Sequence, residues 1–220
     1  MSRPIRTFGR VKARPVKPAQ AALLDDLLPR IAIPAGPYDP TTEGRAEVWL
    51  EIGFGGGEHL AAQAARRPDA LFLGAEPFVN GVASALRHIH EQGLDNVRLW
   101  PGDGRELMAA LPAASLSLLI VLFPDPWPKT RHHKRRLLGP AFADEAARIL
   151  APGGRLRFAT DWADYADQAL DVLAHRSDFA WTAERADDWR KAWPDFAGTR
   201  YHAKAAREQR PPCFLIFRRA

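Results

Sequence analysis

The alternation of short apolar runs with longer amphipathic segments most constrains how this chain can fold. Between residues 46 and 175 the chain switches repeatedly between runs typical of buried strands and segments with helical spacing. Strands are expected at 46–53, 70–76, 96–100, 115–123 and 155–160, and helices at 57–68, 79–93, 104–111, 141–150 and 162–175. Such strands and helices form right-handed βαβ units. The pattern therefore predicts an α/β fold with a mainly parallel, doubly wound sheet.

The last two predicted strands, at residues 179–184 and 213–219, follow a different pattern. A Trp-rich polar segment without a clear helix separates them. Parallel neighbours need a crossover, which is usually helical, so this connection favours an antiparallel edge strand. Near the other end of the chain, residues 21–31 have the pattern of a short amphipathic helix, and a connector rich in proline and glycine follows.

Positive charge is concentrated in three blocks, although the formal net charge is only +5. Six Lys or Arg residues precede Asp25, which is the first acidic residue of the chain. Five more lie between Lys129 and Arg136, and four lie between Arg200 and Arg210. Clustered positive charge of this kind indicates a polyanionic partner such as a nucleic acid.

Composition excludes several other classes of protein. No stretch approaches the roughly 18 to 20 uninterrupted apolar residues of a membrane span, so no membrane partner is expected. Cys213 is the single cysteine, which excludes an internal disulfide and a thiolate metal cluster. The chain also lacks a secretory apolar segment, and we expect a cytoplasmic protein. His132 and His133 are adjacent without a third ligand in view, so no metal site is expected.

A glycine-rich loop, LEIGFGGGEH at residues 50–59, joins the first predicted strand to its helix. Its alternating glycines are Gly53, Gly55 and Gly57. In this kind of sheet the backbone turns tightly here and approaches a ligand closely. A dinucleotide fingerprint would need its third glycine at position 58, which is Glu58, and Glu51 would repel a pyrophosphate. S-adenosylmethionine carries a sulfonium and an ammonium but no phosphate, so the pattern favours this cofactor over NAD.

Two more acids follow at the ends of the next two predicted strands. Glu76 stands where a carboxylate can accept both ribose hydroxyls of the cofactor. Asp103, which precedes Gly104, stands where it can accept the adenine amino protons. Either acid alone could be a helix N-cap or a surface residue. A glycine loop together with acids at three successive strand ends predicts binding of S-adenosylmethionine.

A stiff turn, LFPDPWPK at residues 122–129, ends the fourth predicted strand, beside the expected position of the cofactor's methyl group. Its three prolines fix φ and remove backbone donors, which aims Asp125 and Trp127. A stiff loop loses little entropy when a substrate docks, as positioning in catalysis requires. Trp127 could equally pack beneath the turn.

The runs EIGFGGG, FPDPWPKTRHHKRR, TDW and GTRY, in this order and spacing, resemble the bacterial tRNA (guanine-N7)-methyltransferase family. The N-terminal IRTFGRVKAR is also similar to the start of that family, so the resemblance covers nearly the whole chain. It implies the class I S-adenosylmethionine-dependent methyltransferase (Rossmann-like) fold, S-adenosylmethionine as donor, and methylation of the variable-loop guanosine 46 of tRNA. We expect residues 1–45 to form a basic N-terminal arm with a short helix, and residues 46–220 to form the methyltransferase domain.

The resemblance also implies roles for individual residues. The predicted cofactor-binding residues are Glu51, Gly53, Gly55, Gly57, Glu76, Asp103, Gly104 and Asp125, and Asp125 is also the implied catalytic residue. The implied substrate-binding residues are Lys129, Asp161, Thr199, Arg200, Tyr201 and His202. The implied RNA-contacting residues are Arg131, Lys134, Arg135 and Arg136. The family usually has glutamate where this chain has His202, which leaves the role of that position open.

Three alternatives follow from the same residues. Amino-methylating nucleic-acid enzymes place an Asp/Asn-Pro-Pro-aromatic turn at this strand end, whereas here Asp125 lies between two prolines. A tRNA-binding protein with an inactive methyltransferase fold would not need the intact acids at the strand ends. An NAD oxidoreductase is disfavoured by Glu51 and by the spacing of the glycines.

Overall fold

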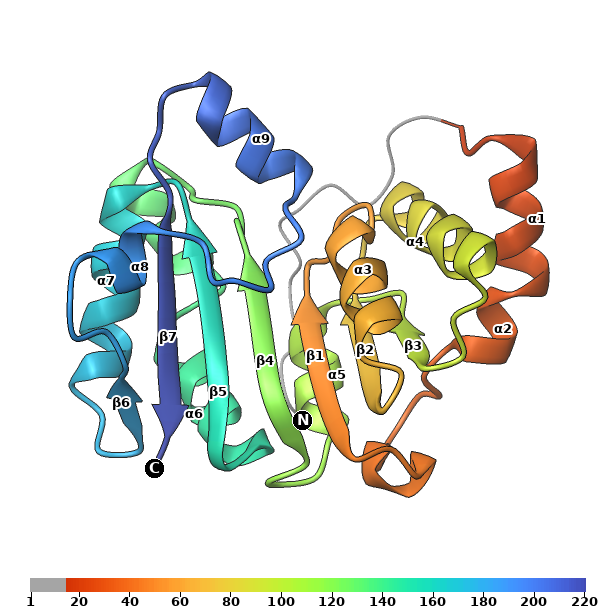
Figure 1. Ribbon diagram of the computed structural model, residues 1–220, viewed down its shortest axis with the longest axis horizontal. Coiled ribbons are helices and arrows are strands. Elements are labelled where there is room, and N and C mark those ends of the chain that lie inside the picture. Colours follow the sequence, from red (N-terminus) through yellow and green to blue (C-terminus); the bar gives the residue numbers. More distant parts are fainter. Residues whose placement is uncertain (1–14) are drawn as a thin grey trace. The chain divides into compact units, whose positions relative to one another are not determined.

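The apolar runs that predict strands in the sequence form β-strands in the computed structural model, which describes residues 15–220 (Figure 1). The chain divides into two units, Met1–Pro112 and Ala113–Ala220. Nearly every buried side chain of the strands in both units is aliphatic or aromatic. Burial of apolar surface, at about 25 cal/mol per Å², is the main force that stabilises such units.

Three parallel strands form the sheet of the first unit, in the order β3, β2, β1. They are β1 (Glu47–Ile52), β2 (Ala70–Ala75) and β3 (Val97–Trp100). The helices are α1 (Pro18–Asp26), α2 (Leu28–Ile31), the 3-10 helix η1 (Pro40–Glu43), α3 (Glu58–Arg66), α4 (Val79–Gln92) and α5 (Gly104–Ala110). The register pairs Glu51 with Gly74 and Ile52 with Ala75, so the carboxyl ends of β1 and β2 are level.

The N-terminal helix prediction is confirmed, with α1 and α2 in place of one helix at 21–31. Helix α1 packs against α4, and the Gln20 side-chain amide lies 3.5 Å from the carbonyl oxygen of Ala83 (Figure 1). Helix α4 ends at Gly93, whose left-handed conformation (φ 61°) terminates it as predicted. The predicted division of the chain at residue 45 stays a prediction, and its residues 1–14 lie outside the described residues.

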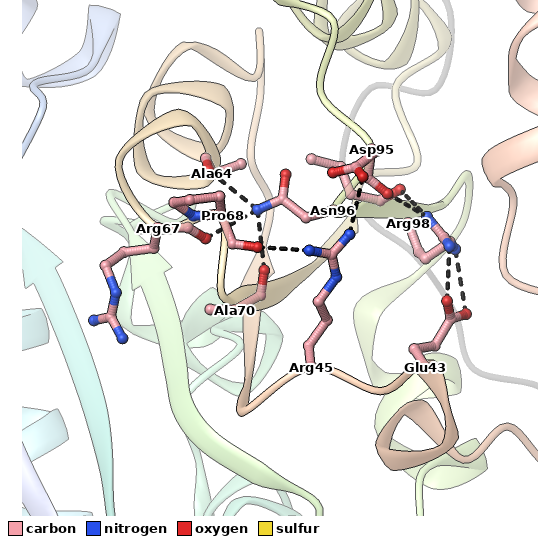
Figure 2. Close-up of polar contacts among 10 residues, drawn as sticks. Glu43, Arg45, Ala64, Arg67, Pro68, Ala70, Asp95, Asn96 and Arg98 are labelled. Carbon is pink, nitrogen blue, oxygen red and sulfur yellow. Dashed lines mark hydrogen bonds and ion pairs between the residues drawn. The ribbon is translucent and has the colours of Figure 1, made fainter.

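Hydrogen bonds tie together the amino ends of the three strands (Figure 2). The buried side-chain amide of Asn96 donates to backbone carbonyl groups. These belong to Ala64, Arg67 and Ala70, at 3.0 to 3.1 Å. Arg45 donates to the Pro68 carbonyl at 2.7 Å, and Arg98 pairs with Glu43 at 2.7 Å. These contacts occupy one end of the sheet, so the loops at the carboxyl ends remain available for chemistry.

Four strands form the sheet of the second unit, in the order β4, β5, β7, β6. They are β4 (Leu116–Leu122), β5 (Leu150–Thr160), β6 (Phe179–Trp181) and β7 (Cys213–Arg219). The helices are the 3-10 helix η2 (Thr130–Arg135), α6 (Pro140–Ile149), α7 (Ala163–Ala174), α8 (Asp187–Arg190) and α9 (Arg200–Arg207). Strands β4 and β5 are parallel, and β7 runs antiparallel to both of its neighbours. The predicted antiparallel strand is thus β7, which lies next to the edge strand β6.

Two short helices, α8 and α9, occupy the segment between β6 and β7 that has no clear helical pattern in the sequence. The expectation of a connection without a clear helix is therefore wrong, whereas the antiparallel strand inferred from it is confirmed. Helix α9 has only eight residues, and only Ala205 of them is buried. One buried position gives no periodic apolar signal, because that signal needs several turns.

Within the described residues, no helix is both long enough and apolar enough to cross a membrane.

Candidate functional site

The glycine loop of the first unit adopts the backbone that its sequence predicts. Gly53, Gly55 and Gly57 all have positive φ, at +73°, +58° and +79°. Space is also limiting, because a Cβ atom on Gly57 would lie 2.5 Å from the Cβ of Ala85. A Cβ on Gly81 of α4 would lie 2.3 Å from the carbonyl oxygen of Gly55. Gly81 is therefore part of the loop's support, although the sequence analysis did not single it out.

The Glu76 carboxylate is fixed directly against the glycine loop. One oxygen accepts a hydrogen bond from the Gly55 backbone N–H at 2.9 Å, and the other accepts one from the Phe78 N–H at 2.9 Å. The side chain is buried. Two backbone donors hold the carboxylate in one orientation, so Glu76 and Gly55, which are 21 residues apart, lie together as one piece of the site.

Asp103 is the N-cap of α5, as one sequence alternative allowed. One of its oxygens accepts from the backbone N–H of Arg105 at 3.0 Å. The Arg105 guanidinium also donates to both carboxylate oxygens, at 2.9 and 2.6 Å, and this bonding raises the pKa of Arg105 above its ordinary value. Next to it, a Cβ on Gly104 would lie 2.5 Å from Cγ2 of Ile52. A ligand that contacts Asp103 must share it with Arg105.

Glu51, at the end of β1, is almost fully buried, with 3% of its surface exposed. Its Oε2 lies 2.8 Å from Nδ1 of His59 in α3. His59 Nε2 lies 3.3 Å from the side-chain amide nitrogen of Gln63, one turn further along the same helix. Neither His59 nor Gln63 was predicted from the sequence as a site residue. Their spacing of four residues on one helix face was the available signal, but only the fold places that face against Glu51.

The proline turn of the second unit contains two strained residues. Phe123 and Trp127 have φ of +48° and +44°, a region that non-glycine residues rarely adopt. Strain of this kind costs on the order of 1 kcal/mol or more per residue and is often found at functional sites. Asp125, between these residues, and Lys129, just after them, are exposed. The turn therefore presents a carboxylate and an ammonium on a rigid, strained backbone.

The basic block forms η2, and its members differ in exposure. Arg131 and Lys134 are exposed, and the Arg135 guanidinium lies 4.9 Å from the ring centroid of Trp127. The Arg136 side chain is only 1% exposed. Its guanidinium donates within the unit, to the Pro126 and Asp164 carbonyls, the Asp164 carboxylate and the Gln168 amide oxygen.

The burial of Arg136 disfavours the predicted RNA contact, which stays a prediction. Its charge is satisfied inside the second unit, where it anchors the proline turn to α7 through Pro126 and Asp164. The ring of Tyr165, 4.7 Å from the guanidinium carbon, covers it. Two members of the predicted RNA-contacting set, Arg131 and Lys134, are exposed as such contacts need, and Arg135 is half-buried over Trp127.

Asp161 follows β5 and pairs with Arg210, whose Nε donates to its carboxylate at 2.6 Å. The Asp161 side chain is 12% exposed. The Arg210 guanidinium also lies 5.3 Å from the ring centroid of Trp162 and pairs with Glu208. The pairing with Asp161 raises the pKa of Arg210 above its ordinary value. Asp161 thus has a local cation as its partner.

The stretch Thr199–His202 is the start of α9. The Thr199 hydroxyl accepts a hydrogen bond from the His202 backbone N–H at 3.0 Å and caps the helix. Arg200 and Tyr201 are exposed, the latter by 56% of its surface. The His202 ring packs among aromatic side chains. Its ring neighbours are Phe123, Phe196 and Phe214, with centroids 5.2 to 6.1 Å away. His202 therefore connects α9 to Phe123 of the proline turn.

Among the residues that the structure describes, no group of three or more His, Cys, Asp or Glu side chains is placed to hold a metal ion. The His132 ring packs edge-on against Trp127 at 5.9 Å. Desolvation, followed by the positive charge of Arg135 and its basic neighbours, lowers the pKa of His132 below its ordinary value.

Known relatives identify the family. A family model described as "Putative methyltransferase" matches residues 45–215. A curated tRNA (guanine-N(7)-)-methyltransferase from Caulobacter sp. (strain K31) is 56% identical over 218 residues, which cover 97% of this chain and 95% of that protein. The chain belongs to the tRNA (guanine-N(7)-)-methyltransferase family. A member from Ruegeria pomeroyi is 49% identical over 228 residues, which cover 99% of this chain and 96% of that protein.

Solved structures agree with the predicted fold. TrmN from Thermus thermophilus has a TM-score of 0.54 at 17% identity, covering 91% of this chain and 48% of that chain. A "putative methyltransferase" from Streptococcus mutans in complex with SAH has a TM-score of 0.54 at 10% identity, covering 94% of this chain and 100% of that chain. At these identities the likeness carries the fold alone. The fold is the class I S-adenosylmethionine-dependent methyltransferase fold, with mainly parallel strands and β7 antiparallel.

Proposed function

We propose that this chain transfers the methyl group of S-adenosylmethionine to N7 of the variable-loop guanosine, nucleotide 46, of tRNA. The observation that carries the proposal is identity of 56% and 49%, over nearly full length, to proteins named tRNA (guanine-N(7)-)-methyltransferase. The SAH in the Streptococcus mutans structure is the demethylated form of this donor, which supports the same cofactor. A cytoplasmic location, expected from the sequence, belongs to the proposal.

The first unit has the residue types that S-adenosylmethionine needs. Gly53, Gly55 and Gly57 have no side chains, so a cofactor can approach the backbone of their loop closely. Each Glu76 oxygen accepts a backbone hydrogen bond, and because a carboxylate oxygen can accept more than one, Glu76 is a candidate acceptor for the ribose hydroxyls. The adenine amino group would share Asp103 with Arg105. When bound, the cofactor supplies a methyl group activated by a positively charged sulfur.

The reaction needs no general base. Guanine N7 has an in-plane lone pair that forms the new bond to the methyl carbon, while the carbon–sulfur bond breaks and its electrons return to sulfur. Positive charge moves to the purine, so a fixed carboxylate can stabilise the transition state. The same carboxylate can accept hydrogen bonds from guanine N1–H and the exocyclic amine and so align N7 with the methyl group.

Asp125 is the better candidate for this carboxylate than Asp161. Asp161 is 12% exposed and paired with Arg210 at 2.6 Å, so a nearby cation already offsets its charge. Asp125 is exposed on the strained proline turn, which Arg136 anchors through the Pro126 carbonyl. We assign Asp125 to guanine positioning and charge stabilisation, with Lys129 beside it as a substrate contact.

RNA backbone contacts are assigned to the exposed cations of η2 and α9. Arg131 and Lys134 are exposed on η2, and Arg200 and Tyr201 are exposed in the first turn of α9. Phosphate contacts from such side chains supply most of the affinity for RNA and make it depend on salt. An exposed aromatic ring such as Tyr201 can also stack on an unpaired base.

The test is methyl transfer from labelled S-adenosylmethionine to unmodified tRNA transcripts, followed by nucleoside analysis. One transcript carries guanosine at nucleotide 46, and a matched transcript carries adenosine there. The expected result is N7-methylguanosine from the first transcript only. Equal labelling of both would overturn the target nucleotide.

The other outcomes separate the remaining functions. N6-methyladenosine in either product would identify an amino-group methyltransferase. Binding of tRNA and of S-adenosylmethionine without any transfer would identify a non-catalytic tRNA-binding protein.

A further inference from the structure

Three buried polar side chains of the first unit, one from β1 and two from α3, contact one another in a row. Glu51 of β1 and His59 and Gln63 of α3 are 3%, 1% and 2% exposed. The Glu51 Oε2 to His59 Nδ1 distance is 2.8 Å, and the His59 Nε2 to Gln63 Nε2 distance is 3.3 Å. Polar groups are rarely buried so deeply in a row without a function or a full set of partners.

The two contacts give the His59 ring one donor nitrogen and one acceptor nitrogen. When the Gln63 side-chain nitrogen donates, His59 Nε2 is the acceptor. His59 Nδ1 then carries the ring proton and donates it to Glu51. In this arrangement His59 donates to Glu51 and accepts from Gln63, and the Glu51 carboxylate is the acidic member of the group.

A buried carboxylate such as that of Glu51 favours a cationic ligand. Charges in a region of low dielectric constant interact more strongly, and with less screening by salt, than charges in water. Glu51 is two residues from Gly53, the first glycine of the loop to which we assign the cofactor. S-adenosylmethionine carries both an ammonium and a sulfonium, so a carboxylate held here stabilises the bound cofactor.

From these contacts we infer that His59 is a positioning residue for the cofactor, which acts through Glu51, and that Gln63 fixes its tautomer. The inference rests on the proposed function, because it takes Glu51 as a residue that attracts the cofactor. His59 orients the carboxylate and keeps it from turning away. Gln63 keeps the imidazole from becoming a second cation beside the cofactor.

The first test compares His59→Leu with His59→Asn in the full chain. Leucine removes the donor to Glu51, whereas an asparagine amide nitrogen can replace Nδ1 as donor. We expect the KM for S-adenosylmethionine to rise about tenfold in His59→Leu and to stay within about threefold of wild type in His59→Asn. The KM for tRNA should not change in either variant. His175→Leu, which alters an exposed histidine at the end of α7, is the control.

A merely structural role for His59 predicts a different result. It would lower the melting temperature and the amount of active enzyme, and so kcat, without raising the KM for S-adenosylmethionine. That outcome would overturn the inference. If His59→Leu does not fold, Gln63→Leu takes its place, with an expected rise of about threefold in the same KM; an unchanged KM there overturns the inference equally.

A double-mutant comparison separates this inference from the proposed function. Glu51→Gln is expected to weaken S-adenosylmethionine binding, measured by calorimetry, and adding His59→Leu should weaken it no further. If Glu51→Gln binds the cofactor as wild type does, the role of Glu51 in the proposed function fails. If Glu51→Gln weakens binding but His59→Leu does not, only the inference fails.

The tautomer of His59 can be measured directly by NMR. Nitrogen-15 NMR of the ring nitrogens distinguishes a neutral imidazole with a proton on Nδ1 from an imidazolium with protons on both nitrogens. The His59 signals are assigned as those missing from His59→Asn. We expect one protonated and one bare nitrogen at pH 7 in the wild type. Two protonated nitrogens would refute the arrangement in which His59 donates through Nδ1 and accepts through Nε2.

Discussion

At the residue scale, Asp125 is the side chain on which the proposed chemistry depends most. It is exposed in the proline turn, where its charge can face the positive purine that forms during transfer. We expect Asp125→Asn to lower kcat by about 10² to 10³-fold, the usual effect of removing one preorganised electrostatic group. The KM values for tRNA and S-adenosylmethionine should change much less. Single-turnover methyl transfer with saturating tRNA and cofactor measures the effect.

The matched control is Asp171→Asn, which removes the carboxylate of another exposed aspartate of the second unit, 81% exposed. This variant should turn over like the wild type. Unchanged single-turnover transfer in Asp125→Asn would remove Asp125 from the catalytic role.

Arg136 and Arg131 should behave oppositely, although they belong to one basic run. Arg136→Met removes buried bonds to Pro126 and Asp164, so we expect the free energy of unfolding to fall by about 2 to 3 kcal/mol. Arg131→Ala should leave the free energy of unfolding within about 0.5 kcal/mol of wild type. It should instead reduce the slope of log affinity for tRNA against log salt by about 0.7 to 0.9.

Urea unfolding and tRNA binding at several salt concentrations measure both variants. A stable Arg136→Met with a reduced salt slope would restore Arg136 to the RNA-contacting set.

The basic run shows what single residues in a sequence cannot reveal. Arg135 and Arg136 are adjacent and chemically equal, yet one lies over Trp127 and the other is buried against Asp164 and Gln168. The difference depends on partners about 30 residues further along the chain, which no local pattern encodes. In contrast, the positive φ of Gly53, Gly55 and Gly57 could be predicted, because glycine tolerates this conformation.

At the element scale, α9 presents the proposed substrate-binding stretch, and its first turn depends on the Thr199 cap. Thr199→Ala removes the hydroxyl that accepts from the His202 N–H, which should cost about 1 kcal/mol of helix stability. Arg200 and Tyr201 in the first turn would then be poorly positioned, so we expect the KM for tRNA to rise several-fold. The KM for S-adenosylmethionine should not change. Steady-state kinetics with each substrate varied separately provides the measurement.

Thr199→Ser is the matched control, because serine keeps the capping hydroxyl. A tRNA KM that rises equally in Thr199→Ser and Thr199→Ala would show that the methyl group, not the cap, is what matters.

His202 stands where the family usually has glutamate, and its packing supplies a reason. Its ring contacts Phe196 at a centroid distance of 5.2 Å. We expect His202→Glu, which restores the usual residue, to lower the free energy of unfolding by about 1 to 2 kcal/mol, because a carboxylate would be desolvated against aromatic rings. His202→Phe should keep the stability, since phenylalanine can retain the edge-on contact. Urea unfolding of both variants measures these free energies. A His202→Glu variant that is more stable than the wild type would contradict the packing argument.

Helices and strands could be predicted where their periodic pattern of apolar residues extends over many positions. Helix α4 and strand β4 have many buried positions at the expected spacing, and both lie where the sequence predicts them. Helix α9 buries only Ala205, and η2 buries none of its residues, so neither leaves a periodic signal. The functional segments of the second unit were therefore found through their motifs, while their local conformation was not.

At the scale of the whole molecule, the basic side chains of residues 1–14 should affect the binding of tRNA but not the binding of S-adenosylmethionine. Residues 1–14, which lie outside the described residues, carry five basic side chains: Arg3, Arg6, Arg10, Lys12 and Arg14. If these side chains neutralise RNA phosphates, removing residues 1–14 should reduce the salt slope of tRNA binding by about 0.7 to 0.9 for each phosphate that is no longer neutralised. Affinity for S-adenosylmethionine should not change, because the proposed cofactor residues all lie between Glu51 and Asp125.

A second full-length variant, with these five residues changed to glutamine, separates charge from chain length. Because counterion release depends on charge alone, we expect this variant to lose as much salt slope as the truncation does. Binding titrations at four or more salt concentrations, with tRNA and with S-adenosylmethionine in parallel, supply the slopes. If the slope falls in the truncation but not in the glutamine variant, residues 1–14 act through interactions other than phosphate neutralisation. A slope that both variants keep would assign the RNA electrostatics to the exposed cations of η2 and α9.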